Sequence, residues 1–313
     1  MPAIKVHAIG KSILFGEHAV VYGYPAIAVP VSSLHTKAVI TPDIRAVRGS
    51  YFLQAPDIHY TGSFEDIPQP NIFMRAVQIF KDVYHLDNIP SFRLNISSQI
   101  PVASGLGSSA SVAVALTRAI SQYLGLKLSE AKINSFAFDL EKVTHGNPSG
   151  IDNTVITYAK TLYFIRDALP LFLQTQHPLH IVLMDSGIHS LTSEVVADIK
   201  AARQHSPKRM DTIFEQIGKL TDQAKDILSS GSQEELGELM NENHILLQRM
   251  GVSTPELNRL VDFALKNHAL GAKLCGAGRG GNVIALLNEE TIPSFTEALV
   301  NQGIKNYYLT TIE

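Results

Sequence analysis

The sequence predicts two domains that combine helices with strands, and three observations support this. The 313 residues exceed what one small core requires, and 45% of them are hydrophobic, which is enough to fill two cores. Strand-like and helix-like apolar spacings both occur in each half of the chain. Proline and glutamine mark a passage between domains at 170–178. We therefore expect one domain over residues 1–175 and a second over residues 176–313.

Composition narrows the function classes. A net charge of -3 without a block of like charge argues against a nucleic-acid or membrane-surface protein. The most apolar stretch, 19–31, is interrupted by glycine and proline and is too short to span a bilayer. The N-terminus lacks the pattern of a cleaved signal. The only cysteine, Cys275, excludes an internal disulfide and suits a reducing compartment, so we expect a cytoplasmic protein.

The first segment should hold polar groups beside buried strands. Strands are expected over 3–9 and 12–15, separated by Gly10 and Lys11, and the glycine-rich stretch 16–26 reads as irregular. Lys11, Glu17 and His18 then lie in a neighbourhood rich in turns. They are either solvated charges of a surface turn or functional groups at strand ends.

The remaining elements follow from apolar spacing and end signals. Glu141 lies at the margin of the apolar stripe of its helix, where a carboxylate needs a partner. We expect helices over 71–84 (capped by Asn71), 110–125, 129–143 (capped by Ser129), from Thr192 as cap, 232–251 (with a Ser232/Glu235 capping box) and 254–271, and strands over 92–100, 161–167 and 179–187.

The stretch PVASGLGSSAS, residues 101–111, has the composition of an anion-binding loop. Its glycines allow close backbone approach, and it opens onto a helix whose first N–H groups lack intrahelical partners. Phosphate is the ligand that matches such a site best. The alternative is a flexible Gly/Ser loop, because short glycine motifs are weak evidence.

Two further segments bear on the same chemistry. KLCGAGRGGNVIALL, residues 273–287, joins two strand-like runs through four glycines, more than a hairpin needs, and suits a loop that closes on a ligand. HGNPSGIDN, residues 145–153, presents Asp152 on a sharp turn, where the aspartate is either functional or merely a helix cap or turn former.

Phosphoryl transfer requires few parts, and the chain offers each of them. The loop at 104–109 can cradle phosphates, and Ser109 with Glu141 can supply hard oxygen ligands to Mg²⁺. Asp152 can orient or deprotonate an alcohol. Lys11 can hold Asp152 ionised and stabilise developing charge.

Three segments resemble, in order and spacing, the motifs of the GHMP small-molecule kinases. They are AIGKSILFGEHAVVYG (8–23), PVASGLGSSAS (101–111) and KLCGAGRGGNV (273–283). Glu141 with HGNPSGIDN, and MGVSTPELNRLV (250–261), are most similar to the mevalonate kinase branch. The resemblance implies an α+β two-domain GHMP-kinase fold, with an N-terminal domain like one found in ribosomal proteins and a ferredoxin-like C-terminal domain. It also implies ATP and Mg²⁺ as cofactors and mevalonate, an isoprenoid precursor, as substrate.

The resemblance also implies roles for individual residues. Asp152 matches the catalytic base, and Lys11 matches the lysine that pairs with it. Ser109 and Glu141 match magnesium ligands. The nucleotide segment corresponds to Pro101, Ser104, Gly105, Leu106, Gly107, Ser108 and Ser109. The substrate side corresponds to Glu17, His18, Thr192, Gly278 and Arg279.

Two departures and two alternatives remain open. Ile9 stands where the family usually has proline, and Arg279 replaces a glycine. A sibling kinase acting on phosphomevalonate, homoserine or a sugar is one alternative, and a non-catalytic ligand sensor on the same fold is the other. The sequence does not decide the oligomeric state, for which a homodimer is one option.

Overall fold

The computed structural model describes residues 3–102, 104–146, 148–166 and 168–313. The chain forms two compact units. Unit 1 comprises residues 1–10, 34–102 and 107–159, and unit 2 comprises residues 11–33, 103–106 and 160–313. The strands β1 (Ile4–Phe15) and β2 (Ala26–Pro42) begin in one unit and end in the other. The boundary expected at residue 175 stays a prediction.

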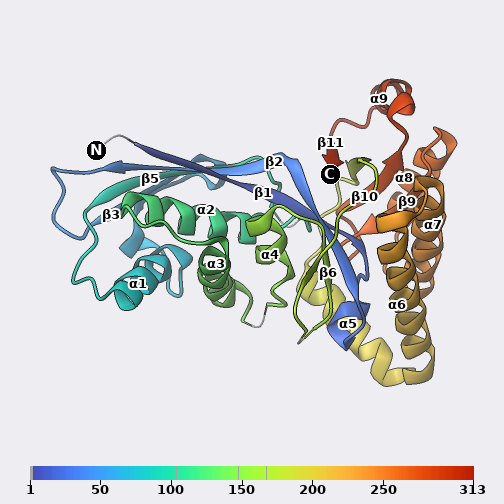
Figure 1. Ribbon diagram of the computed structural model, residues 1–313, viewed down its shortest axis with the longest axis horizontal. Helices are drawn as coiled ribbons and strands as arrows, with labels where there is room; N and C mark the ends of the chain where they lie inside the picture. The colour runs from blue at the N-terminus through green and yellow to red at the C-terminus, as the bar shows by residue number, and fades with distance from the viewer. Residues whose placement is uncertain (1–2, 103, 147, 167) are drawn as a thin grey trace. The chain divides into compact units, whose positions relative to one another are not determined.

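Unit 1 is a sheet covered by helices on one face (Figure 1). Its strands follow the order β4-β3-β5-β2, in which Ala38 of β2 lies opposite Ile96 of β5. The helices pack on the sheet through a core that includes Phe64, Phe80 and Phe92. Besides β1 and β2, the elements are β3 (Tyr51–Ala55), β4 (Tyr60–Ser63), α1 (Ile72–Tyr84), β5 (Phe92–Ser98), α2 (Ser108–Tyr123), α3 (Glu130–His145) and α4 (Ile151–Tyr158).

Unit 2 contains the antiparallel sheet β11-β8-β10-β9. Because helices separate β8 from β9 and β10 from β11, this strand order is that of a ferredoxin-like βαββαβ domain and confirms the expected class. Its elements are β6 (Leu162–Phe164), β7 (Leu171–Phe172), β8 (Leu179–Asp185), α5 (Thr192–His205), α6 (Pro207–Ser230), α7 (Gln233–Met250), α8 (Pro255–Lys266), β9 (Gly271–Cys275), β10 (Asn282–Leu287), α9 (Ile292–Asn301) and β11 (Tyr307–Ile312).

Several local predictions are confirmed. The Asn71 side chain accepts a hydrogen bond from the Met74 amide at 2.8 Å and caps α1. The Ser129 hydroxyl caps α3, and Ser232 with Glu235 forms the expected capping box of α7. Cys275 is buried, which raises its thiol pKa to about 11 and identifies it as a core residue.

Other local predictions are wrong. Residues 4–15 form one strand through Gly10, because pairing of β1 with β2 outweighs the low strand preference of glycine. The segment after Gly150 is a helix, α4, rather than a bare turn. Only 162–164 of the strand expected over 161–167 is a strand, and Asp167 lies outside the described residues. In the described residues, no helix is long and apolar enough to cross a bilayer.

Candidate active site

The serine-rich end of the anion loop forms the beginning of α2 in unit 1. Gly107, with φ +78°, is the N-cap residue, and Ser108 and Ser109 are the first residues of the helix. Gly107 has no side chain with which to cap the first turn, so the N–H groups there can turn to an anion. The helix behind them packs through Ala113, Leu116 and other apolar side chains, which hold this end in place.

Ser109 and Glu141 come together, as the sequence predicts for a shared site. The Ser109 hydroxyl donates to Oε1 of Glu141 at 2.6 Å, and Nε2 of His145 lies 3.8 Å from the other carboxylate oxygen. Glu141 is only 4% exposed although its side chain ends in a carboxyl group. One hydroxyl and one carboxylate are the hard oxygen donors that suit magnesium. The pair therefore fits such an ion, and its role as ligand stays a prediction.

Asp152 is the second residue of α4 in unit 1, where it is half-buried. Gly150, with φ +86°, starts the helix. Nδ2 of Asn153 donates to Oδ1 of Asn134 on α3 at 2.6 Å, and the Thr154 hydroxyl donates to the Gly150 carbonyl at 2.6 Å. These bonds fix the first turn of α4 against α3. Asn134 and Asn153, which position the turn that carries Asp152, are not among the site residues that the sequence predicts.

Lys11 lies on β1 in unit 2 and is 6% exposed, which excludes a solvated surface turn. Its amide donates to the carbonyl of Leu106 at 3.0 Å. The strand that carries the predicted catalytic lysine is thus tied to the predicted nucleotide segment. The pairing of Lys11 with Asp152 stays a prediction.

Within unit 2 the two glycine-rich segments lie next to each other. Nδ2 of Asn282 donates to the carbonyl of Ser104 at 2.8 Å. A Cβ added to Gly105 would lie 3.9 Å from the Cα of Gly276. Residues 104–106 therefore lie directly beside the loop 276–281, as expected if both segments serve one ligand.

The loop 276–281 requires its glycines. Gly278 (φ +81°) lies so close to residue 252 that an added Cβ would lie 2.3 Å from the Val252 carbonyl oxygen, and a Cβ on Gly280 would lie 2.3 Å from that of Ile188. Amides of the loop donate to the same two carbonyls, from Arg279 at 2.6 Å and from Gly281 at 2.8 Å. The loop is thus a fixed piece of backbone rather than a flexible linker.

Glu17 and His18 are buried in unit 2 at 3% and 7% exposure, so the alternative of solvated surface charges is wrong for them too. Glu17 forms an ion pair with Lys273 of β9. His18 donates from Nε2 to the Ala277 carbonyl at 2.8 Å, and burial lowers its pKa. The imidazole is therefore neutral, with Nδ1 as a hydrogen-bond acceptor.

The remaining substrate-side candidates lie at the start of α5 and in the loop. Thr192 is exposed and is the first residue of α5; the cap position belongs to Leu191, so the predicted cap is one residue off. Arg279 adopts φ +58° and forms an ion pair with Asp198 on α5. The guanidinium thus ties the loop to the helix that Thr192 begins. Contact of either side chain with substrate stays a prediction.

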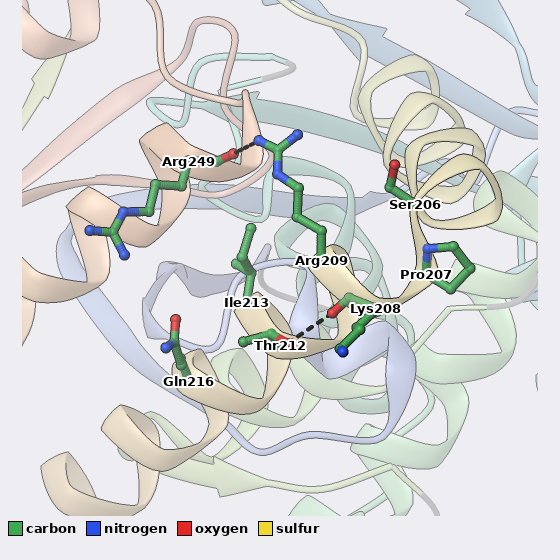
Figure 2. Close-up of a pocket in the computed structure, with 8 residues that line it drawn as sticks. All are labelled: Ser206, Pro207, Lys208, Arg209, Thr212, Ile213, Gln216 and Arg249. Carbon is green, nitrogen blue, oxygen red and sulfur yellow. Dashed lines mark hydrogen bonds between the residues drawn. The ribbon is translucent and has the colours of Figure 1, made fainter.

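A separate hollow in unit 2 contains none of the predicted site residues. It has a volume of about 680 Å³ and lies where α5 meets α6 and α7 ends (Figure 2). Lys208, Arg209 and Arg249 line it, and Arg209 donates to the Arg249 carbonyl at 2.8 Å. The hollow therefore does not coincide with the residues to which the chemistry points.

Comparison with known proteins gives the family. Models described as the GHMP kinases N-terminal domain and the GHMP kinases C-terminal domain match residues 71–160 and 223–305. A mevalonate kinase of Pyrococcus horikoshii is 38% identical over 304 residues, covering 90% of this chain and 88% of that protein. The chain belongs to the mevalonate kinase family of GHMP kinases.

Solved structures agree with this family. The L. major mevalonate kinase in complex with R-mevalonate is 31% identical, covers 99% of this chain and 96% of its own, and has a TM-score of 0.82. The Methanococcus jannaschii mevalonate kinase is 28% identical, covers 99% and 98%, and has a TM-score of 0.85. As a member of the mevalonate kinase family, the chain is an ATP-dependent small-molecule kinase with the two-domain α+β fold that the sequence predicts.

Proposed function

We propose that this protein transfers the γ-phosphoryl group of ATP to the primary hydroxyl of mevalonate and forms 5-phosphomevalonate. The relatives named above support the acceptor, since their similarity extends over nearly the whole chain. The observation that carries the chemistry is the contact of half-buried Ser109 with buried Glu141 at the start of α2, where the first N–H groups suit an anion. A structural helix start does not require a buried carboxylate.

Asp152 accepts the proton of the mevalonate hydroxyl. The freed oxygen bonds to the γ-phosphorus while the bond from that phosphorus to the β-phosphate oxygen breaks, and ADP leaves. Lys11 keeps Asp152 ionised and stabilises charge on the transferred group. Bound Mg²⁺, held by Ser109 and Glu141, would neutralise phosphate charge.

The backbone of unit 2 supplies the surroundings. Residues 104–106 offer amides to the phosphates, and the adjoining loop 276–281 closes the same side. Neutral His18 can accept a substrate hydroxyl through Nδ1, and Thr192, Gly278 and Arg279 complete the substrate side. We also propose that the protein works in the cytoplasm. The boundary between its two domains along the chain is proposed to lie near residue 175.

A substrate panel tests this function. ADP release is measured with mevalonate, phosphomevalonate, galactose and homoserine in parallel, each with and without Mg²⁺. We expect turnover with mevalonate that requires Mg²⁺, and turnover at least about 100-fold lower with the other three acceptors. Preference for phosphomevalonate would replace the proposed acceptor, and binding of mevalonate without ADP release would indicate the sensor alternative.

A further inference from the structure

Glu17 and Lys273 form a charged pair that is closed to solvent on all sides. Both side chains have 0% exposure, and they form an ion pair within unit 2. Lys273 is among the largest fully buried side chains of the described residues. Burial raises the pKa of the Glu17 carboxyl, and the Lys273 ammonium opposes that shift. No substrate can reach this carboxylate without displacing the core around it.

Neighbouring groups of unit 2 form further hydrogen bonds with both members of the pair. Oε1 of Glu17 accepts from Lys273, and Oε2 accepts from Nδ2 of Asn243 on α7 at 3.2 Å. Nζ of Lys273 also donates to the Leu274 carbonyl at 2.9 Å. Both oxygens of the carboxylate therefore point at protein donors rather than at an open site.

Stability alone does not explain a pair of this kind. Removing two charges from water costs about as much as their attraction returns, and apolar residues of similar volume often stabilise a core as well or better. What apolar residues lack is directionality, because hydrogen-bonded charges fix the distance and orientation between two segments. The position of the pair therefore indicates what it holds.

The pair joins the end of β1 to the strand that leads into the glycine-rich loop. Glu17 follows Gly16, where an added Cβ would lie 2.4 Å from the Pro25 carbonyl oxygen, so this backbone has no room to shift. Lys273 lies on β9, three residues before Gly276. Next to Glu17, His18 donates to the carbonyl of Ala277 inside the loop at 2.8 Å. Two successive side chains thus hold β9 and the loop.

We propose that Glu17 and Lys273 are a positioning pair that sets the glycine-rich loop 276–281 against the strand carrying Lys11, and that Glu17 does not contact substrate. The expected changes in kcat and KM rest on the proposed function, whereas the expected changes in unfolding energy do not depend on it. Because the loop borders the nucleotide segment as well as the substrate side, a misplaced loop affects both ligands.

A double-mutant cycle tests the pair. Glu17→Gln, Lys273→Met and the double variant are compared by denaturant unfolding and by kcat and KM for ATP and for mevalonate. Each single change leaves one buried charge without its partner, so we expect each to lower the free energy of unfolding. We also expect each to lower kcat/KM for ATP and for mevalonate by about 100-fold, because the loop is misplaced. The double variant, which has no charge to leave unpaired, should be more stable than either single variant and kinetically no worse. Glu215→Gln with Lys219→Met removes an exposed pair of α6 as the matched control and should change neither measurement.

The opposite result is equally clear. If Glu17 contacts substrate, Glu17→Gln raises KM for mevalonate alone, Lys273→Met leaves it within twofold, and the double variant matches Glu17→Gln; that pattern overturns the proposal. If a single variant does not fold, the folded double variant still decides: KM values for ATP and mevalonate that stay unchanged or rise together support positioning, whereas a raised KM for mevalonate with an unchanged KM for ATP refutes it. If the wild type does not phosphorylate mevalonate, the proposed function fails, whereas additive unfolding energies in the cycle would refute the pair.

Discussion

The two units carry unlike groups of predicted site residues. In unit 1 the predicted groups, Ser109 and Asp152, project from first turns of helices and are half-buried. In unit 2 the corresponding segment consists of glycine backbone and a charged pair with no exposed surface. The difference teaches that the predicted reactive groups of unit 1 are side chains at helix starts, whereas much of the predicted site in unit 2 is glycine backbone next to buried side chains. Substitution of Asp152 in unit 1 should therefore affect turnover, and substitution of the close-packed glycines of unit 2 should affect folding stability first.

Asp152→Asn is the strongest test of the predicted site residues in unit 1. The amide keeps the shape of the side chain but cannot accept the hydroxyl proton, so we expect kcat to fall about 10²- to 10⁴-fold while the free energy of unfolding stays unchanged. Single-turnover kinetics with mevalonate measures the effect. Asp139→Asn on α3, whose carboxylate pairs at the surface with Lys142, is the control and should keep full activity. A variant at position 152 that retains wild-type turnover would remove the base from the mechanism.

Gly278→Ala tests, through folding stability, whether the loop 276–281 of unit 2 is fixed. The left-handed φ of +81° and the approach of the Val252 carbonyl oxygen to 2.3 Å both oppose a Cβ, so we expect a loss of about 2–4 kcal/mol in urea unfolding. Gly303 has a similar φ of +75° but open space around it. Gly303→Ala therefore measures only the cost of the left-handed backbone conformation for alanine, about 1 kcal/mol in the free energy of unfolding. Equal losses at the two positions would mean that the loop yields and is not fixed.

The pH dependence of folding stability tests the buried His244 of unit 2. His244 on α7 donates from Nε2 to Asn258 and accepts at Nδ1 from the Leu274 amide, and burial lowers its pKa to about 4. The unfolded chain binds this proton at its ordinary value of 6.5, so stability falls as pH drops from 6.5 toward 4. We expect a loss of about 2 kcal/mol between pH 7.5 and pH 5 from this group. His244→Gln should reduce the slope, and an unchanged slope would assign it to other groups.

Arg279→Gly should have the smallest effect on stability. The ion pair with Asp198 is partly exposed and contributes little, and glycine adopts the positive φ of this position without strain. We expect the free energy of unfolding to change by less than about 1 kcal/mol. Asp198→Asn, which removes only the ion pair, serves as the control for KM of mevalonate. A rise in KM confined to Arg279→Gly would place the guanidinium on the substrate, and equal KM values would leave it as a tie between the loop and α5.

Local signals explain which predictions succeeded. Caps such as Asn71, Ser129 and Ser232 are confirmed because the cap accepts a hydrogen bond from the amide only three residues away. The long helix α6 is not among the predicted helices. Its apolar residues Met210, Ile213, Phe214 and Ile217 nevertheless recur at helical spacing, which is a sequence signal for this helix. The continuity of β1 through Gly10 could not be predicted in this way, since a partner strand decides it.

The sequence by itself determined the family, the ferredoxin-like class of unit 2 and the residue types needed for phosphoryl transfer, because ordered motifs and short-range bonds are written in neighbouring residues. The sequence also predicted that Ser109 and Glu141 share a site, and the tertiary structure added the direct hydrogen bond between them. Only the tertiary structure placed Lys273 against Glu17 across 256 positions, inside the core. Spacing along a chain does not specify which distant side chains meet, since burial and packing select those contacts after the local elements have formed.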